Sequence, residues 1–144
     1  MYNIPEIPDE FNLGDYLLDR HIREGRGDKA AIYYKDEVIT FQEFVEAANR
    51  AGNALLKLGV EEENRVIICL PDCPEFLYSY FGAMRIGAIP VPVSTMALPG
   101  DYKYYLNDSR AKVLITDENL APNMMEVFDE LRYLRHFIVS GKPV

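Results

Sequence analysis

The sequence predicts an α/β fold: a three-layer unit in which a parallel sheet lies between helices, preceded by a smaller unit of one helix and two strands. Three observations support this. Strand and helix patterns alternate from Arg65 onward, and the run 65–70 is nearly continuously apolar, without the alternation of a half-exposed strand. An apolar stripe after Thr40 repeats with helical period. We therefore divide the chain into 1–64 and 65–144, both belonging to one larger domain.

The first unit begins with a short amphipathic helix. Asn12 is a suitable N-cap for a helix over 13–24, which a glycine follows directly. Two short strands are expected at 30–34 and 38–40 around the turn 35–37.

The clearest local signal is a capping box before a second helix. Thr40 can accept a hydrogen bond from the Glu43 backbone N–H while the Glu43 carboxylate accepts one from the Thr40 N–H. Ile39 and Phe44 occupy the two hydrophobic staple positions, and Gly59 supplies a helix stop. The apolar face of this helix, which needs a sheet to lie on, comprises Phe41, Phe44, Val45, Ala48, Ala51, Leu55 and Leu58.

The run 65–70 is predicted to be a central parallel strand, covered on both faces. Asp72 offers a cap and Pro74 a first-turn residue, so a helix follows from about 74 to 85 and stops at Gly87.

The remaining elements continue the alternation of strand and helix. Residues 88–93 form an extended segment whose two prolines each remove a ladder donor, which favours the margin of the sheet. We then expect a helix at 101–107, a strand at 112–116, a helix opened by Pro122 with Met124, Phe128 and Leu131 on one face, and a strand at 136–140.

Two features suggest a piece of something larger. The helix segment 76–84 carries no charge and is apolar almost all round, so it should be buried on more than one side. The strand 136–140 is followed by only four residues, where an alternating pattern would ordinarily continue.

Composition excludes several function classes. Fifteen Lys and Arg against 23 Asp and Glu leave a net charge of -8 without a basic stripe, so neither nucleic acid nor a membrane surface is an expected partner. The chain start resembles no secretory signal, and the longest charge-free window, 86–100, contains three prolines. Two cysteines fit a reducing compartment, and we expect a cytoplasmic protein.

Few residues can support chemistry. Gly25 and Gly27 are the only close glycine pair, they do not join a strand to a helix, and no phosphate-cradling loop is present. Cys69 ends a strand and Cys73 lies near a helix N-terminus, whose dipole could lower its pKa, so redox chemistry is conceivable. Two packed thiols are the favoured interpretation.

The other polar and aromatic residues also favour structural roles. His21 and His136 are too far apart in the fold pattern for a zinc site. Asp108, Asp117 and Glu118 lie near helix or strand ends and are interpreted as solvated capping groups. Five tyrosines could stack on a planar ligand, but helix packing is favoured; they are Tyr78, Tyr80, Tyr102, Tyr104 and Tyr105.

Three ordered motifs resemble the N-terminal part of the adenylate-forming superfamily, which contains acyl- and aryl-CoA synthetases, firefly luciferase and peptide-synthetase adenylation domains. Residues 39–44 (ITFQEF) resemble its L-T-Y-x-E-L element, and 84–93 (MRIGAIPVPV) resemble K-A-G-x-x-x-V-P. Between them, 70–76 (LPDCPEF) resemble L-P-N-S-P-E-F. The resemblance implies a partial domain of a larger adenylating-enzyme fold.

Four further segments resemble the benzoate-CoA ligase branch: 11–16 (FNLGDY), 25–29 (GRGDK), 49–55 (NRAGNAL) and 101–110 (DYKYYLNDSR). Such enzymes use ATP and magnesium to form an acyl-adenylate, from which the coenzyme A thiol displaces AMP. The resemblance implies that the phosphate loop, the ribose-binding Asp and the mobile lysine lie downstream, so no catalytic or metal-binding residue is assigned to this chain.

One departure from the family concerns a loop expected on the coenzyme A side. Ser94, Thr95 and Met96 stand where some relatives have N-P-R, whose arginine can face a coenzyme A phosphate. Met96 cannot make that contact.

Three functional hypotheses follow. The first is an N-terminal portion of an acid-CoA ligase, inactive alone, whose partners are the remainder of its own polypeptide and, through exposed apolar surface, a second copy. The second is a free-standing binding or assembly module on the same scaffold. The third is a small thiol oxidoreductase using Cys69 and Cys73.

Overall fold

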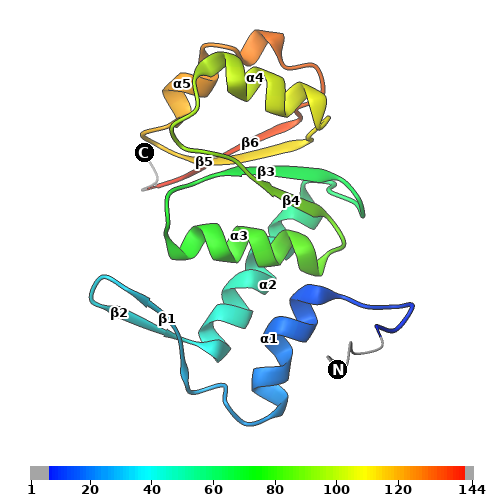
Figure 1. The fold of residues 1–144 in the computed structure, drawn as a ribbon, viewed down its shortest axis with the longest axis vertical. Helices are drawn as coiled ribbons and strands as arrows, with labels where there is room; N and C mark the ends of the chain where they lie inside the picture. The colour runs from blue at the N-terminus through cyan, green and yellow to red at the C-terminus, as the bar shows by residue number, and fades with distance from the viewer. Residues whose placement is uncertain (1–6, 142–144) are drawn as a thin grey trace, which may run out of the picture.

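Four parallel strands form the sheet at the centre of the molecule (Figure 1). The computed structural model describes residues 7–141. The spatial order is β4-β3-β5-β6, and the strands are β3 (Arg65–Cys69), β4 (Ile89–Pro92), β5 (Val113–Asp117) and β6 (His136–Ser140). β3 pairs with β4 on one side and β5 on the other, which confirms the predicted central strand. The proline-containing β4 is an edge strand, as predicted.

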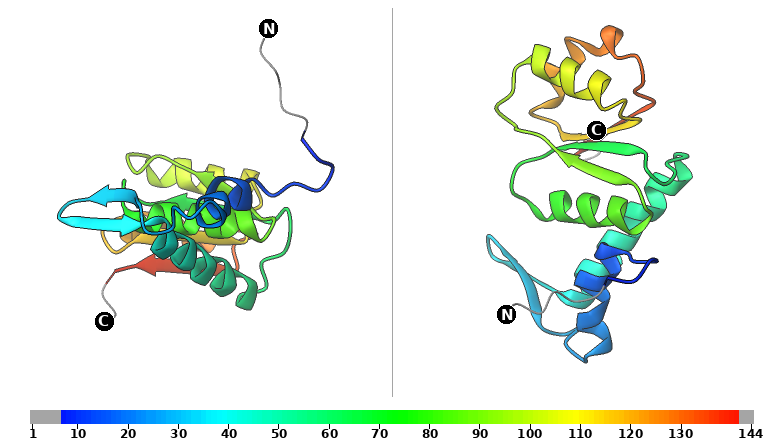
Figure 2. Two further views of the ribbon diagram at one scale, coloured as in Figure 1. Left: turned by 90° about the horizontal axis from the view of Figure 1, so that it is seen from below. Right: turned by 45° about the vertical axis from the view of Figure 1, so that its right-hand side comes forward.

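Helices cover both faces of this sheet. Helices α4 (Pro99–Asp108) and α5 (Ala121–Met125) lie on one face, and α3 (Pro74–Arg85) lies on the other (Figure 1). Beyond α3 lies α2 (Phe41–Lys57), whose C-terminal end reaches the sheet (Figure 2). The three-layer α/β prediction is confirmed. No helix of residues 7–141 is both long and apolar enough to cross a membrane.

The N-terminal unit contains α1 (Leu13–Arg23) and an antiparallel hairpin of β1 (Ala30–Tyr34) and β2 (Glu37–Thr40). The Asn12 side chain accepts from the Asp15 N–H at 3.2 Å and caps α1, as predicted. The second strand begins one residue earlier than expected because Glu37 pairs with Tyr34.

The capping box of α2 is present. The Thr40 N–H donates to Glu43 Oε2 at 2.8 Å, and the Glu43 N–H donates to Thr40 Oγ1 at 3.2 Å. The bonds that the Thr40 N–H and the Thr40 hydroxyl donate to the Glu43 carboxylate lower the pKa of Glu43. Ile39 and Phe44 are buried in the same apolar cluster, as their staple positions predict.

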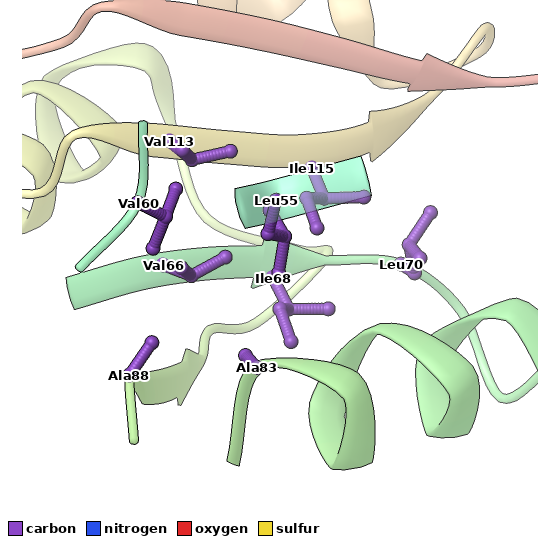
Figure 3. Close-up of a cluster of buried hydrophobic side chains, with 9 residues drawn as sticks. All are labelled: Leu55, Val60, Val66, Ile68, Leu70, Ala83, Ala88, Val113 and Ile115. Atoms are coloured by element: carbon purple, nitrogen blue, oxygen red, sulfur yellow. The ribbon is translucent and has the colours of Figure 1, made fainter. Parts of the chain in front are cut away.

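Helix α2 packs chiefly against α3 and not, as expected, against a sheet. The two helices approach so closely at Gly52 and Gly82 that a Cβ on Gly82 would lie 2.7 Å from the Ala48 carbonyl oxygen. Only the C-terminal end of α2 reaches the sheet, where Leu55 lies against Ile68 and Ile115 (Figure 3).

Helix α3 is held on more than one side, as its nearly continuous apolar surface predicts. It contacts β3, β4 and α2, and α1 docks on its C-terminal end. There Asn12 Nδ2 donates to the carbonyl oxygens of Met84 and Arg85 at 3.2 and 3.1 Å. The Arg85 guanidinium makes paired hydrogen bonds of 2.9 and 3.2 Å to Asp19, so the N-terminal unit is anchored to the parallel-sheet unit.

Two predicted details are wrong. Asp72 does not cap α3; the N-cap is Cys73, which makes no side-chain cap hydrogen bond. The helix opened by Pro122 ends at Met125 and is followed by a 3-10 turn, Phe128–Glu130. The 3-10 turn is wound more tightly than an α-helix, so the side chains after Met125 do not keep the spacing of the predicted apolar face. Val127 is buried in place of Phe128, which is 41% exposed.

The glycine crossing leads to the first prediction. Gly82→Ala places a methyl group 2.7 to 2.8 Å from three atoms of α2, and we expect it to lower the free energy of unfolding by about 1 to 3 kcal/mol despite the better helix propensity of alanine. Urea denaturation measures the change. Gly100→Ala in α4 is the control because its Cβ meets nothing within 4 Å. Equal stability of the two variants would contradict the close-packed crossing.

Candidate functional site

The candidate site is the edge of the sheet where the strands end. Because all four strands are parallel, their carboxyl ends share one edge. From β3 the chain passes through α3 on one face, whereas from β5 it passes through α5 on the opposite face (Figure 1). The connections that follow the neighbouring strands β3 and β5 therefore run to opposite sides of the sheet. Open α/β sheets bind their ligands at the carboxyl ends of two such strands.

The loop after β4 is held to this edge by its backbone. The Tyr102 hydroxyl on α4 donates to the Ser94 carbonyl oxygen at 3.1 Å, and the Met96 N–H donates to Ser94 Oγ at 3.1 Å. Thr95 is half-buried, but the side chain of Met96 is 89% exposed. The loop therefore projects an uncharged side chain into solvent, and its predicted place beside coenzyme A stays a prediction.

The two thiols are poor nucleophiles. Cys69 is fully buried, with Sγ 3.7 Å from the Ser94 carbonyl oxygen and 3.6 Å from the Tyr102 hydroxyl. Burial raises the pKa of the Cys69 thiol, and it also raises the pKa of the half-buried Cys73 thiol. The pKa of Cys73 is therefore raised and not lowered, because desolvation outweighs the hydrogen bonds from the backbone N–H groups of Phe76 and Glu75.

Thr116, a residue that sequence reasoning missed, lies beside Cys69 in the register of β3 and β5. It is fully buried, and its Oγ1 has no hydrogen-bond partner among the described residues. A buried hydroxyl without a partner costs about 1 to 3 kcal/mol. The only signal in the sequence is a polar residue inside an apolar strand pattern. Because β-branched threonine is common in strands, this signal is easily overlooked.

Of the acidic residues predicted as caps, Asp117 has such a structural role. Asp117 Oδ1 accepts from the backbone N–H groups of Asn119 and Leu120, both at 2.9 Å, and closes the turn into α5. Glu118 lies beside Gly141, and Asp108 is the last residue of α4. The structure brings none of the three into a shared acid-base pair with another site residue.

The remaining candidates are dispersed. His21 stacks on Phe41 with ring centroids 3.9 Å apart, whereas His136 begins β6. Within residues 7–141 no group of three His, Cys, Asp or Glu side chains could hold a metal ion. Tyr102 packs inside the protein as expected, and Tyr78, Tyr80 and Tyr105 are half-buried, but Tyr104 is 62% exposed.

The loops that follow β3, β4 and β5 lack the backbone feature that binds phosphates. These loops, residues 70–73, 93–98 and 117–120, contain no glycine. A phosphate cradle needs successive N–H groups in a conformation that glycine allows. The arrangement can therefore form one wall of a site, but its own groups supply neither a phosphate cradle nor an activated nucleophile.

Comparison with known proteins gives a consistent result. The family model described as AMP-binding enzyme matches residues 18–143. Benzoate-CoA ligase from Thauera aromatica is 31% identical over 137 residues, and acetyl-coenzyme A synthetase from Bacillus subtilis is 41% identical over 141 residues. These matches cover 94% and 92% of this chain but 26% and 24% of the relatives. The chain thus spans about a quarter of their length.

Solved structures agree. An anthranilate CoA ligase in complex with anthranoyl-AMP superposes with a TM-score of 0.89 at 34% identity, covering 94% of this chain and 26% of that one. A benzoate CoA ligase from Burkholderia xenovorans superposes with a TM-score of 0.83 at 30% identity, covering 92% and 26%.

The thiol geometry leads to the second prediction. Because burial raises the pKa of both thiols, less thiolate forms at a given pH, and iodoacetamide should modify native Cys73 more slowly than free cysteine at pH 7.5. Cys69 should react only after unfolding in urea. Mass spectrometry of timed samples measures both, with Cys73→Ser as the control that removes native-state labelling. Faster labelling of Cys73 than of free cysteine would revive the oxidoreductase hypothesis.

Proposed function

Because this chain belongs to the AMP-binding enzyme family, we propose that it is the N-terminal portion of an ATP-dependent carboxylic acid-CoA ligase. In the proposed reaction, the acid attacks ATP to form an acyl-adenylate and pyrophosphate, and the coenzyme A thiol then displaces AMP. The proposal assigns this chain a scaffold role and assigns the binding of ATP, magnesium and coenzyme A mainly to further polypeptide. Its two free cysteines suit the cytoplasm, where we place the enzyme.

The observation that carries this proposal is the combination of a near-complete structural match with an edge that lacks reactive groups. The match to the anthranilate CoA ligase covers 94% of the chain with a TM-score of 0.89. The residues shared with the family motifs serve geometry: Thr40 and Glu43 cap α2, and Gly87 turns the chain into β4 with φ 75°. A Cβ on Gly87 would lie 2.8 Å from Glu62 Cγ, so the turn needs glycine.

For the substrate class we propose an aryl carboxylic acid. Benzoate-CoA ligase from Thauera aromatica at 31% identity and 4-hydroxybenzoate-CoA/benzoate-CoA ligase from Rhodopseudomonas palustris at 34% support this choice. The acetyl-coenzyme A synthetase at 41% identity makes a small aliphatic acid the competitor. Benzoate and acetate are therefore the two acids to compare.

The third prediction is that the 144-residue chain alone is inactive. With ATP, Mg²⁺ and either benzoate or acetate, we expect no carboxylate-dependent exchange of labelled pyrophosphate into ATP, because the edge offers no phosphate cradle. Full-length Thauera aromatica benzoate-CoA ligase is the positive control. Exchange catalysed by the purified chain would contradict the proposed division of roles.

A chimera separates the ligase proposal from a non-catalytic assembly module. We expect that replacing the matched quarter of the Thauera aromatica ligase by residues 7–141 retains benzoate-dependent formation of benzoyl-CoA, since this chain superposes on the benzoate CoA ligase from Burkholderia xenovorans. A chimera that folds but forms no thioester would favour the module.

The fourth prediction concerns the loop of Ser94, Thr95 and Met96, which we propose faces coenzyme A. In the chimera, Met96→Arg supplies a guanidinium that can pair with a phosphate, and we expect KM for coenzyme A to fall by roughly threefold to tenfold with KM for benzoate unchanged. Arg110→Met, which changes a charge beyond the C-terminal end of α4, serves as a control for charge. Equal KM for coenzyme A before and after Met96→Arg would remove the loop from the site.

A further inference from the structure

The segment 24–29, which joins α1 to β1 at the base of the molecule, lies against the first turn of α2 (Figure 1). The Phe41 N–H donates to the Lys29 carbonyl oxygen at 3.0 Å. The Gln42 N–H donates to the Gly27 carbonyl oxygen at 2.9 Å. These are the first two backbone N–H groups of α2, which have no partner within their own helix. The segment therefore satisfies part of the N-terminus of α2.

His21, in the last turn of α1, contacts both this segment and α2. Its ring stacks on the Phe41 ring with centroids 3.9 Å apart and planes 14° apart. The Arg26 guanidinium lies at its Nδ1, with Nε at 3.2 Å and Nη2 at 3.0 Å. The Arg26 N–H also donates to the His21 carbonyl oxygen at 2.8 Å. One side chain of α1 thus contacts the segment and the first residue of α2.

The contact with Arg26 determines where the ring proton of His21 lies. A guanidinium only donates hydrogen bonds, and a neutral imidazole has a single acceptor nitrogen. The two shorter contacts of Arg26 favour Nδ1 as this acceptor over the 3.5 Å contact of Arg20 Nε with Nε2. The neutral ring therefore carries its proton on Nε2.

Protonation of the His21 ring conflicts with these contacts. It removes the acceptor at Nδ1 and places a third cation beside Arg20 and Arg26. The N-terminus of α2 at Phe41 adds repulsion, whereas the C-terminus of α1 and Glu24 attract the added charge. Glu24 already forms an ion pair with Arg26. Burial lowers the pKa of His21, the two arginine charges lower it further, and the opposing effect of Glu24 is smaller.

We propose that His21 is a pH-sensitive switch: its neutral ring keeps the segment 24–29 against the first turn of α2, and its protonation releases Arg26 and opens the segment. Because the pKa of His21 is lowered in the folded protein, this stabilisation is fully present above the ordinary value of 6.5. It is lost as the pH falls from there through the lower pKa of the folded protein. All of these contacts lie within residues 20–42, so the switch operates independently of the proposed ligase reaction.

The fifth prediction concerns the titration of the His21 ring in the 144-residue chain. Two-dimensional NMR of the ring nitrogens should give a midpoint below 6.5 and a neutral form protonated on Nε2, with His21→Gln assigning the signals. Arg26→Met removes a cation and the donors at Nδ1, so it should raise the midpoint. Arg23→Met is the matched control, because it removes the same charge from the same helix turn at an exposed position. A midpoint at or above 6.5, or equal shifts in the two variants, would overturn the proposal.

Hydrogen exchange tests the release of the segment. Between pH 7.5 and 5.5, where carboxyl groups with ordinary pKa values stay ionised, the protection factors of the Arg26 and Gln42 amides should fall as the pH is lowered. Those of β3 should stay constant. His21→Gln retains an acceptor for Arg26 but does not titrate, so the two protection factors should become independent of pH. An equal fall in His21→Gln and in the unchanged chain would refute the switch.

Discussion

The architecture depends on the close approach of α2 and α3 at Gly52 and Gly82. Backbone atoms of the two helices replace side chains at the crossing, since a Cβ on either glycine would lie under 3 Å from an atom of the other helix. This contact draws α2 onto α3 instead of onto the sheet. The ion pair of Arg85 with Asp19 fixes α1 to the C-terminal end of α3, and α1 also packs against α2.

The crossing also explains why the two faces of the sheet differ. On one face α4 and α5 cover a cluster that includes Ile67, Cys69 and Leu114. The hydroxyl of Tyr102 on α4 also binds the Ser94 carbonyl oxygen in the loop after β4. On the other face α3 covers β3 and β4 but leaves Ile115 and Ile138 lining an open groove. The helices therefore cover one face of the sheet more completely than the other.

At the carboxyl edge, two polar groups have partners within the chain. The Ser94 carbonyl accepts from the Tyr102 hydroxyl, and Asp117 accepts from two backbone N–H groups. Thr116 differs from them, because its buried hydroxyl has no partner among residues 7–141.

Local chemistry in the sequence was sufficient to predict most elements and the resemblance to adenylate-forming enzymes. The Thr40–Glu43 capping box, the apolar run of β3 and the prolines of β4 act over a few residues, so their outcome is readable without neighbours. Local chemistry did not predict that α5 ends at Met125 or that α2 packs on α3. It also did not predict the raised pKa values of Cys69 and Cys73. Each depends on groups distant in sequence, and only the tertiary structure determines which backbone faces Gly82 and how much water reaches a thiol.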